Sequence, residues 1–254
     1  MTKPSPNVQP VPNWWQLPFA MAVARPKLLP THCYLCQIHP LVQANKSQSH
    51  THWFNQLAFL CENCHATLAW QQSQFPLEIV ENNQITVING VASSFYQFPY
   101  QQIIRDFKNS HQLDKLPLLI HAIRQLDKPA HCHAQNSVIV AVPTTIKRLT
   151  QRGFDPVTLL VQYLSFHWQI PVFTGIIRED RQKQQGLTRE QRLINTQNAF
   201  YFTELPRVPN VIVFDDVATT GATLQSLIDS LLNTQCQSPS NPAYIFHARA
   251  VAHG

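Results

Sequence analysis

The sequence predicts an α/β fold in which a parallel sheet is flanked by helices and preceded by a small metal-binding domain. Beyond residue 135, short apolar runs typical of buried strands alternate with amphipathic helical segments, and this order is typical of parallel sheets. Near the N-terminus, four cysteines form two C-x2-C pairs. A chain of 254 residues that is 44% hydrophobic can form one sizeable core and a small satellite domain.

Residues 1–27 are expected to be a Pro-rich, partly disordered segment that Trp14 and Trp15 dock onto the core. The sequence contains no run of eighteen apolar residues, and the apolar run 17–24 is interrupted by Pro18. We therefore expect a cytoplasmic protein without a transmembrane segment. The net charge of +5 mildly favours anionic partners. Taken alone, however, it is what ordinary surface charge would give.

The cysteine spacing predicts a zinc ribbon over residues 28–74. Each C-x2-C pair lets two thiolates reach one tetrahedral ion, and two pairs complete a closed structural site. The expected ligands are Cys33, Cys36, Cys61 and Cys64. A redox dithiol and disulfides are the alternatives, and one cysteine could be replaced by a histidine from the set His32, His39, His50, His52 and His65. The lone Cys132 and Cys236 are expected to pack as small buried side chains.

Residues 75–254 are expected to form the larger domain, with a hairpin and helices over 75–130 and an α/β core over 135–254. Apolar positions alternate over residues 82–98 around an Asn89-Gly90 pair, which is a strong hairpin signal. Residues 100–126 carry apolar side chains at helical spacing. In the core, the expected strands are 137–143, 171–177, 210–214 and 243–250, and the expected helices are 154–167 and 220–232.

Two further segments of the core are predicted to be irregular. The polar, basic interval 178–198 lies between the second and third strands, and a connection of this length is typical of a flexible functional lid. The Ser/Pro/Asn-rich segment 233–242 is expected to be a surface linker.

The strand at 210–214 is followed by two aspartates and a threonine-rich turn. Asp215 and Asp216 are expected at the carboxyl end of this strand, where open α/β sheets bind ligands. The turn that enters the next helix offers backbone N–H groups and hydroxyls to a phosphate, while the carboxylates suit sugar hydroxyls. A ribose phosphate is therefore the expected ligand, and we expect both carboxylates to be open to solvent. The alternative is a buried strand that ends in Asp and is followed by a threonine N-cap.

The placement of the six glycines argues against other phosphate motifs. They are Gly90, Gly153, Gly175, Gly186, Gly221 and Gly254. No two are close enough for G-x-G-x-x-G or a Walker loop, so ordinary dinucleotide binding and P-loop NTPase activity are disfavoured.

The run "VIVFDDVATTGAT" resembles the phosphoribosyl pyrophosphate (PRPP) signature of type I phosphoribosyltransferases, and over residues 28–250 the chain resembles the ComF family of competence-associated proteins, which includes GntX. The other matching features are the four-cysteine ribbon, Lys108, "VPTTIKRLTQRGF", Gln184-x-x-Leu187, Arg192-x-x-Asn195, Ala199-Phe200 and Ala248-Arg249. The chain departs from the family at Asp155, where Asn is usual, and at Thr144 and Thr145. Asp155 would place an anion near the expected pyrophosphate.

The resemblance implies a type I phosphoribosyltransferase-like fold with PRPP and Mg²⁺ as ligands. It implies that Asp215 and Asp216 contact the ribose hydroxyls and that the 5′-phosphate is bound by Ala218, Thr219, Thr220, Gly221, Ala222 and Thr223. The segment Pro143 to Arg152 would be the pyrophosphate loop, with Thr144, Thr145, Lys147, Arg148 and Arg152 as its contacts.

The resemblance also implies a process, DNA uptake in natural transformation, in which single-stranded DNA and competence or recombination proteins are the partners. The expected lid and DNA contacts are Lys108, Arg178, Arg181, Lys183, Arg189 and Arg192. These cations could equally serve PRPP alone or solvate a loop. The implied fold supports PRPP binding without turnover as readily as catalysis, so the alternative is an active Mg-dependent phosphoribosyltransferase in nucleotide salvage or biosynthesis.

Overall fold

A six-stranded, mostly parallel sheet forms the centre of the computed structural model, which describes residues 31–41, 59–68, 73–81, 84–109, 112–179, 199–236 and 242–254. The strand order is β1-β2-β8-β7-β3-β4, and only the β1–β2 pair is antiparallel. The strands are β1 (Ser73–Glu81), β2 (Gln84–Phe95), β3 (Ser137–Ala141), β4 (Val172–Phe173), β7 (Asn210–Ala218) and β8 (Ile245–His253). The α/β class predicted from the alternation of apolar runs is confirmed.

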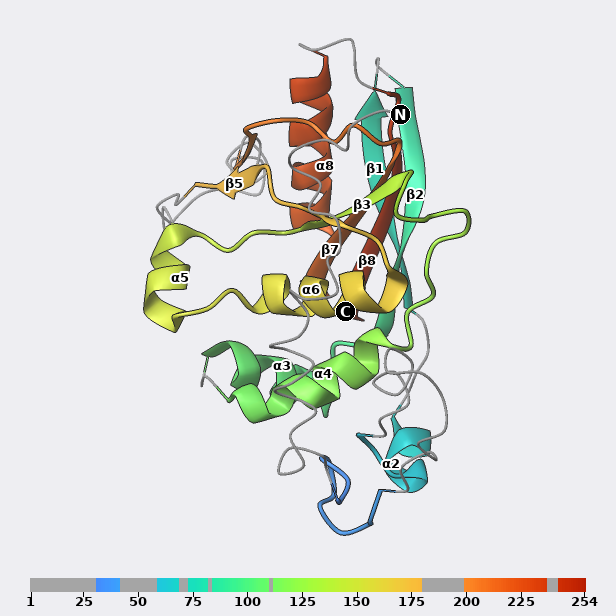
Figure 1. Cartoon of the computed structure of the whole chain (residues 1–254), viewed down its shortest axis with the longest axis vertical. Coiled ribbons are helices and arrows are strands. Elements are labelled where there is room, and N and C mark those ends of the chain that lie inside the picture. Colours follow the sequence, from blue (N-terminus) through green and yellow to red (C-terminus); the bar gives the residue numbers. More distant parts are fainter. Residues whose placement is uncertain are drawn as a thin grey trace.

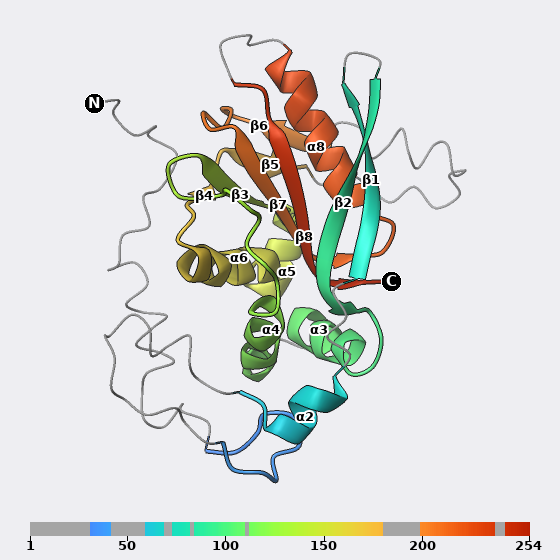
Figure 2. The same ribbon diagram turned by 90° about the vertical axis from the view of Figure 1, so that its right-hand side faces the viewer.

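Helices cover both faces of this sheet (Figure 1, Figure 2). One face carries α3 (Tyr100–Asn109), α4 (Leu116–Ile123) and α6 (Pro156–Trp168), and the other carries α8 (Ala222–Gln235). Successive residues of β7 alternate between the two cores, because Ile212 packs with the first group of helices and Val213 packs with α8. A strand segment covered on both faces is typically apolar, which is why residues 138–141 of β3 and 211–214 of β7 appear in the sequence as unbroken apolar runs.

The described part of the cysteine-rich segment packs on the layer of α3 and α4. It includes α2 (Glu62–Thr67) and the buried Phe59. The guanidinium of Arg124 lies 4.8 Å from the centre of the Phe59 ring, and its Nε donates a hydrogen bond of 2.7 Å to the Tyr163 hydroxyl. The imidazoles of His65 and His121 are joined by a hydrogen bond of 3.0 Å. These contacts connect α2 and its surroundings to α4 and α6.

The β1–β2 hairpin is present, but its turn is not at Asn89-Gly90 as predicted. Those residues lie inside β2, where Gly90 pairs with Phe75 of β1. A Cβ at residue 90 would clash with the Phe75 ring, so the glycine serves a close approach between strands rather than a turn. The strands are joined through residues 82–83, which lie outside the described residues.

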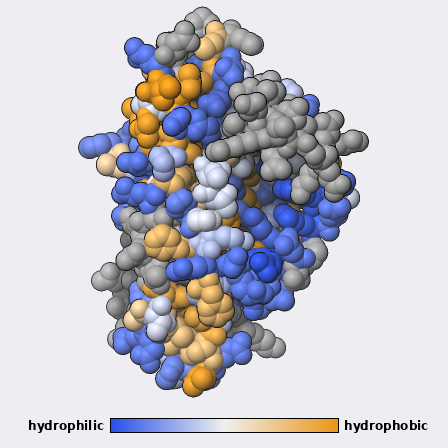
Figure 3. Space-filling view, turned by 180° about the vertical axis from the view of Figure 1, so that it is seen from behind, coloured by the Kyte–Doolittle hydropathy of each residue, from blue (hydrophilic) through white to orange (hydrophobic). Residues whose placement is uncertain are grey.

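The end of this hairpin next to the connecting residues 82–83 carries exposed apolar side chains. Val80, Ile85 and Val87 are 55%, 67% and 57% exposed. Seen from behind, the molecule has apolar areas near both ends of its long axis, separated by hydrophilic surface (Figure 3).

The predicted strand 171–177 is two strands in different sheets. Phe173 ends β4 in the main core, whereas β5 (Ile176–Arg178) pairs antiparallel with β6 (Phe200–Phe202) in a separate two-stranded sheet. The chain leaves the main sheet between them, where the Gly175 carbonyl accepts a hydrogen bond from Thr203. The other predicted core strands and helices are present with shifted ends, and β7 continues past 214 to Ala218 because β8 pairs with it that far.

The two lone cysteines differ. Cys132 is buried, as predicted, whereas Cys236 is exposed, because it follows the last turn of α8 at the surface. The expectations for residues 1–27, for most of the segment 178–198 and for 237–241 within the linker concern residues outside the described ones. Among the helices that the structure describes, none is long and apolar enough to cross a membrane.

Candidate functional site

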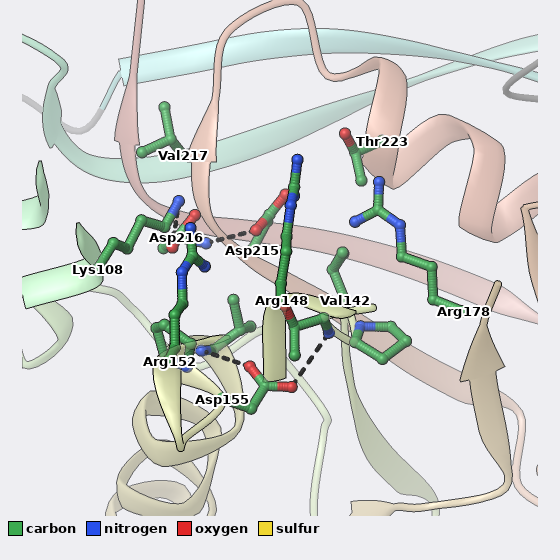
Figure 4. Close-up of a pocket in the computed structure, with 14 residues that line it drawn as sticks. Lys108, Val142, Arg148, Arg152, Asp155, Arg178, Asp215, Asp216, Val217 and Thr223 are labelled. Atoms are coloured by element: carbon green, nitrogen blue, oxygen red, sulfur yellow. Dashed lines mark hydrogen bonds and ion pairs between the residues drawn. The ribbon is translucent and has the colours of Figure 1, made fainter. Parts of the chain in front are cut away.

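A polar cavity of about 300 Å³ lies at the carboxyl ends of β3 and β7 (Figure 4). Strand β3 ends at Ala141, which pairs with Phe214, while its neighbour β7 continues to Ala218. The two aspartates of β7 therefore have no strand beside them on the β3 side. Segments that are far apart in the sequence supply the polar lining: Lys108, Thr144, Arg148, Arg152, Asp155, Arg178, Asp215, Asp216 and Thr223.

An ion pair joins α3 to β7 in this cavity. Lys108 Nζ lies 2.6 Å from Asp216 Oδ2, and the side chains are 26% and 5% exposed, respectively. The backbone N–H of Asp216 donates a hydrogen bond of 2.8 Å to Asp215 Oδ1. Lys108 was expected among the lid and DNA contacts, and the structure places it against the acidic pair instead.

The two aspartates are less accessible than the sequence suggested. Asp215 and Asp216 are 9% and 3% exposed, so the expectation that both carboxylates are open to solvent is wrong. The reason is that both residues belong to β7 instead of following it, and Lys108 covers Asp216. Burial raises the pKa of Asp215 well above its usual range, and the charge of Asp216 raises it further. Both residues nevertheless line the cavity.

Three arginines form the basic side of the cavity. Arg148 and Arg152 come from α5 (Ile146–Arg152), and Arg152 donates a hydrogen bond of 3.3 Å to Asn109 Oδ1 at the end of α3. Arg178 comes from β5, and its guanidinium lies 5.2 Å from the centre of the Phe200 ring. Burial lowers the pKa of Arg178, and the charge of Arg148 lowers it further. Cations that repel one another in a half-buried cavity favour the binding of an anion.

Asp155 lines the cavity, and both of its carboxylate oxygens accept hydrogen bonds from backbone N–H groups. Its Oδ1 accepts hydrogen bonds from the N–H groups of Val157 and Thr158 at the start of α6, which makes it the N-cap. Its Oδ2 accepts a hydrogen bond of 3.1 Å from the N–H of Thr144. The departure from the family pattern at this position therefore ties the segment before α5 to α6.

The first turn of α8 contributes one side chain, Thr223, to the cavity lining. Gly221 has a φ of 71°, and a Cβ there would also clash with Leu77. Thr220 Oγ1 accepts a hydrogen bond from the N–H of Ala222. Several predicted contacts do not line the cavity, namely Thr145, Lys147, Ala218, Thr219, Thr220, Gly221 and Ala222. Thr145 instead caps α5, where its side chain accepts from the N–H of Arg148.

The remaining predicted lid residues lie outside the described residues: Arg181, Lys183, Arg189 and Arg192. Arg178, predicted as the first lid residue, belongs to β5. Sequence reasoning missed that Lys108 pairs with Asp216 and that Asp155 holds Thr144. An N-cap signal was present in the Asp155-Pro156 pair, since proline favours the first turn of a helix. No local pattern indicates the partner of Lys108.

The four predicted cysteine ligands do come together. The Sγ atoms of Cys33, Cys36, Cys61 and Cys64 all lie within 4.8 Å of one another, so the cluster could hold a metal ion such as zinc. Within the described residues, no histidine belongs to this cluster, and His50 and His52 lie outside them. Hydrogen bonds from the backbone at His39 and Ile38 lower the pKa of Cys36 to about 6, whereas burial raises the pKa of Cys64 to about 12.

Comparison of the chain with models of known protein families, and with curated proteins, finds no match.

The buried charge of Asp215 gives a stability prediction. Asp215→Asn should raise the free energy of unfolding at neutral pH by about 0.5–2 kcal/mol, because it removes a carboxylate that burial disfavours. The asparagine oxygen can still accept from the N–H of Asp216. Since the folded protein holds the Asp215 proton more tightly than the unfolded chain, wild-type stability falls as the pH rises from about 4 through the raised pKa. The difference in unfolding free energy between Asp215→Asn and the wild type should therefore be largest above that pKa and vanish near about pH 4.

Denaturant titrations at several pH values measure this difference. Asp216→Asn is the matched control, because it leaves Lys108 without its partner and should not stabilise the protein. A gain for Asp215→Asn that is the same at every pH, or a loss at neutral pH, would contradict the prediction.

Proposed function

We propose that the chain is a ComF-like protein with a type I phosphoribosyltransferase-like fold and that its cavity binds PRPP. The observation that carries this proposal is a single cavity that combines the Asp215–Asp216 pair, Thr223 at the start of α8, and four cations. Its position at the carboxyl ends of parallel strands is where such sheets bind ligands.

The chemistry of PRPP matches these groups. The acidic pair would accept hydrogen bonds from ribose hydroxyls, and the start of α8 would receive the 5′-phosphate through its N–H groups and Thr223. The cations of α3, α5 and β5 would neutralise the pyrophosphate. Mg²⁺, when bound with PRPP, would be held by pyrophosphate oxygens together with the acidic side of the cavity, and it would add positive charge there.

The same groups suit turnover, which is the alternative function. In a phosphoribosyltransferase, the bond from C1 to the pyrophosphate oxygen breaks with its electron pair leaving on pyrophosphate, and an acceptor nucleophile bonds to C1. The protein would position the reactants and neutralise the leaving group with Arg148, Arg152 and Lys108. This alternative is an Mg-dependent enzyme of nucleotide salvage or biosynthesis.

Calorimetric titration tests the proposed ligand. The wild-type protein should bind PRPP in the presence of Mg²⁺, and the double variant Asp215→Asn plus Asp216→Asn should lose at least about 10-fold in affinity, since hydrogen bonds to charged groups contribute about 1.5–3 kcal/mol. Glu78→Ala plus Asp114→Ala is the control, because it removes two carboxylates that do not line the cavity. Absence of binding to the wild type, or unchanged affinity in the aspartate double variant, would overturn the proposal.

Single-stranded DNA in natural transformation is the second ligand that we propose. The observation in its favour is that α5 exposes Arg148, which lines the cavity, and the adjacent Lys147, which lies outside the cavity lining, so that a strand of phosphorylated sugars could follow this surface. Binding of a labelled oligonucleotide, measured by fluorescence anisotropy, should weaken as salt rises. Lys147→Gln plus Arg148→Gln should reduce the slope of log K against log salt by about 1.4, or about 0.7 for each phosphate that the variant no longer neutralises.

Lys115→Gln plus Lys128→Gln is the control for the DNA measurement, since neither residue lines the cavity. Absent or salt-independent binding would remove DNA from the proposed ligands. An equal change of slope in the control would assign DNA binding to general surface charge.

We also propose that the cysteine cluster holds one structural zinc ion. Cys33 is 1% exposed and belongs to the same core cluster as the buried face of α3, so loss of the metal should loosen that layer. Elemental analysis should find one zinc per chain, and a chelator should lower the melting temperature. Cys33→Ser should lose the zinc, whereas Cys236→Ser, at an exposed position, should keep it. Wild-type protein without zinc would contradict the proposal.

A further inference from the structure

Lys108 is placed differently from the other cations of the cavity. Among the described residues, it is the cavity cation that pairs with a carboxylate, at 2.6 Å from Asp216 Oδ2. No ion pair of this kind joins Arg148, Arg152 or Arg178 to a carboxylate within the described part of the chain. Lys108 therefore already has an anionic partner before any ligand enters.

The ion pair occupies one of the carboxylate oxygens that a ribose hydroxyl could use. Asp216 Oδ2 is the oxygen that Lys108 contacts, and the Asp216 side chain is 5% exposed. The other carboxylate, Asp215, uses Oδ1 to accept from the N–H of Asp216. A sugar diol that approaches this pair must compete with an ammonium group for Asp216, and the uncharged hydroxyl makes the weaker partner.

A second anion in the cavity would change this competition. The guanidinium of Arg152, from α5, reaches the end of α3 that carries Lys108, because it donates a hydrogen bond to Asn109, the residue after Lys108. The lysine ammonium is a compact charge on a flexible four-carbon stem, so it can exchange one nearby anion for another. A phosphoryl group held by Arg148 and Arg152 would be such an anion, in the same cavity as Asp216 (Figure 4).

We propose that Lys108 is a specificity-determining residue that selects pentose phosphates with an anionic group at C1. In the free protein Lys108 pairs with Asp216. When the ligand carries phosphoryl oxygens at C1, Lys108 transfers to them and frees Asp216 to accept from a ribose hydroxyl. A pentose 5-phosphate without this group leaves the ion pair in place and binds weakly. This inference rests on the proposed phosphoribosyl function of the cavity.

Calorimetry with two ligands tests it: PRPP with Mg²⁺ and ribose 5-phosphate. Lys108→Met should weaken PRPP binding about 10- to 100-fold, the loss expected for one charge-assisted contact, while ribose 5-phosphate binding stays unchanged or tightens. The ratio of the two affinities should therefore fall at least about 10-fold. Lys115→Met is the matched control, because Lys115 is also in an ion pair, with Asp114, and does not line the cavity.

Lys108→Gln is a second variant in case the methionine variant does not fold, since its amide can donate to Asp216 without a charge. It should show the same fall in the affinity ratio, and Lys108→Arg should restore part of it. Equal weakening of both ligands, or an unchanged ratio in a folded variant, would overturn the inference and leave the proposed function standing. A wild-type protein that binds neither ligand would overturn the proposed function itself.

Discussion

Two adjacent carboxylates in a buried strand impose the strongest physical constraint on this protein. Asp215 and Asp216 lie side by side in β7, and burial together with the charge of Asp216 raises the pKa of Asp215. A cation from a separate helix compensates part of this negative charge: Lys108 of α3 forms an ion pair with Asp216. The position of α3 relative to the sheet is thus a requirement of the site as well as of the core.

The remaining charges of the cavity follow from the lengths of the strands. Because β3 stops at Ala141, the chain that follows it turns into α5 in front of the aspartates and brings Arg148 and Arg152 with it. Asp155 fixes the start of this segment, because its Oδ1 caps α6 and its Oδ2 accepts a hydrogen bond from the N–H of Thr144. Backbone hydrogen bonds to Asp155 therefore hold the segment that leads into α5 with Arg148 and Arg152, whereas Lys108 pairs directly with Asp216.

The sequence was sufficient for features that depend on local patterns. Unbroken apolar runs marked β3 and the first half of β7, cysteine spacing marked the cluster of four thiols, and the two aspartates marked one wall of the cavity. Features set by tertiary contacts could not be found in this way. Asn89-Gly90 has the composition of a turn, yet Phe75 packs against Gly90 inside a strand. The partner of Lys108 depends on a contact across more than a hundred positions of the sequence, which no periodicity records.

The cysteine cluster and the cavity are connected through the same helix layer. The buried face of α3 consists of Tyr100, Ile103, Ile104 and Phe107. These residues share one core with Cys33 and Phe59. Phe107, the residue before Lys108, also packs edge to face on Phe154, with ring centres 5.4 Å apart. Phe154 directly precedes Asp155, the N-cap of α6. Movement of α3 would therefore disturb the core under the cysteine cluster and the Lys108–Asp216 pair together. The cysteine cluster and the helix that carries Lys108 therefore share one hydrophobic core.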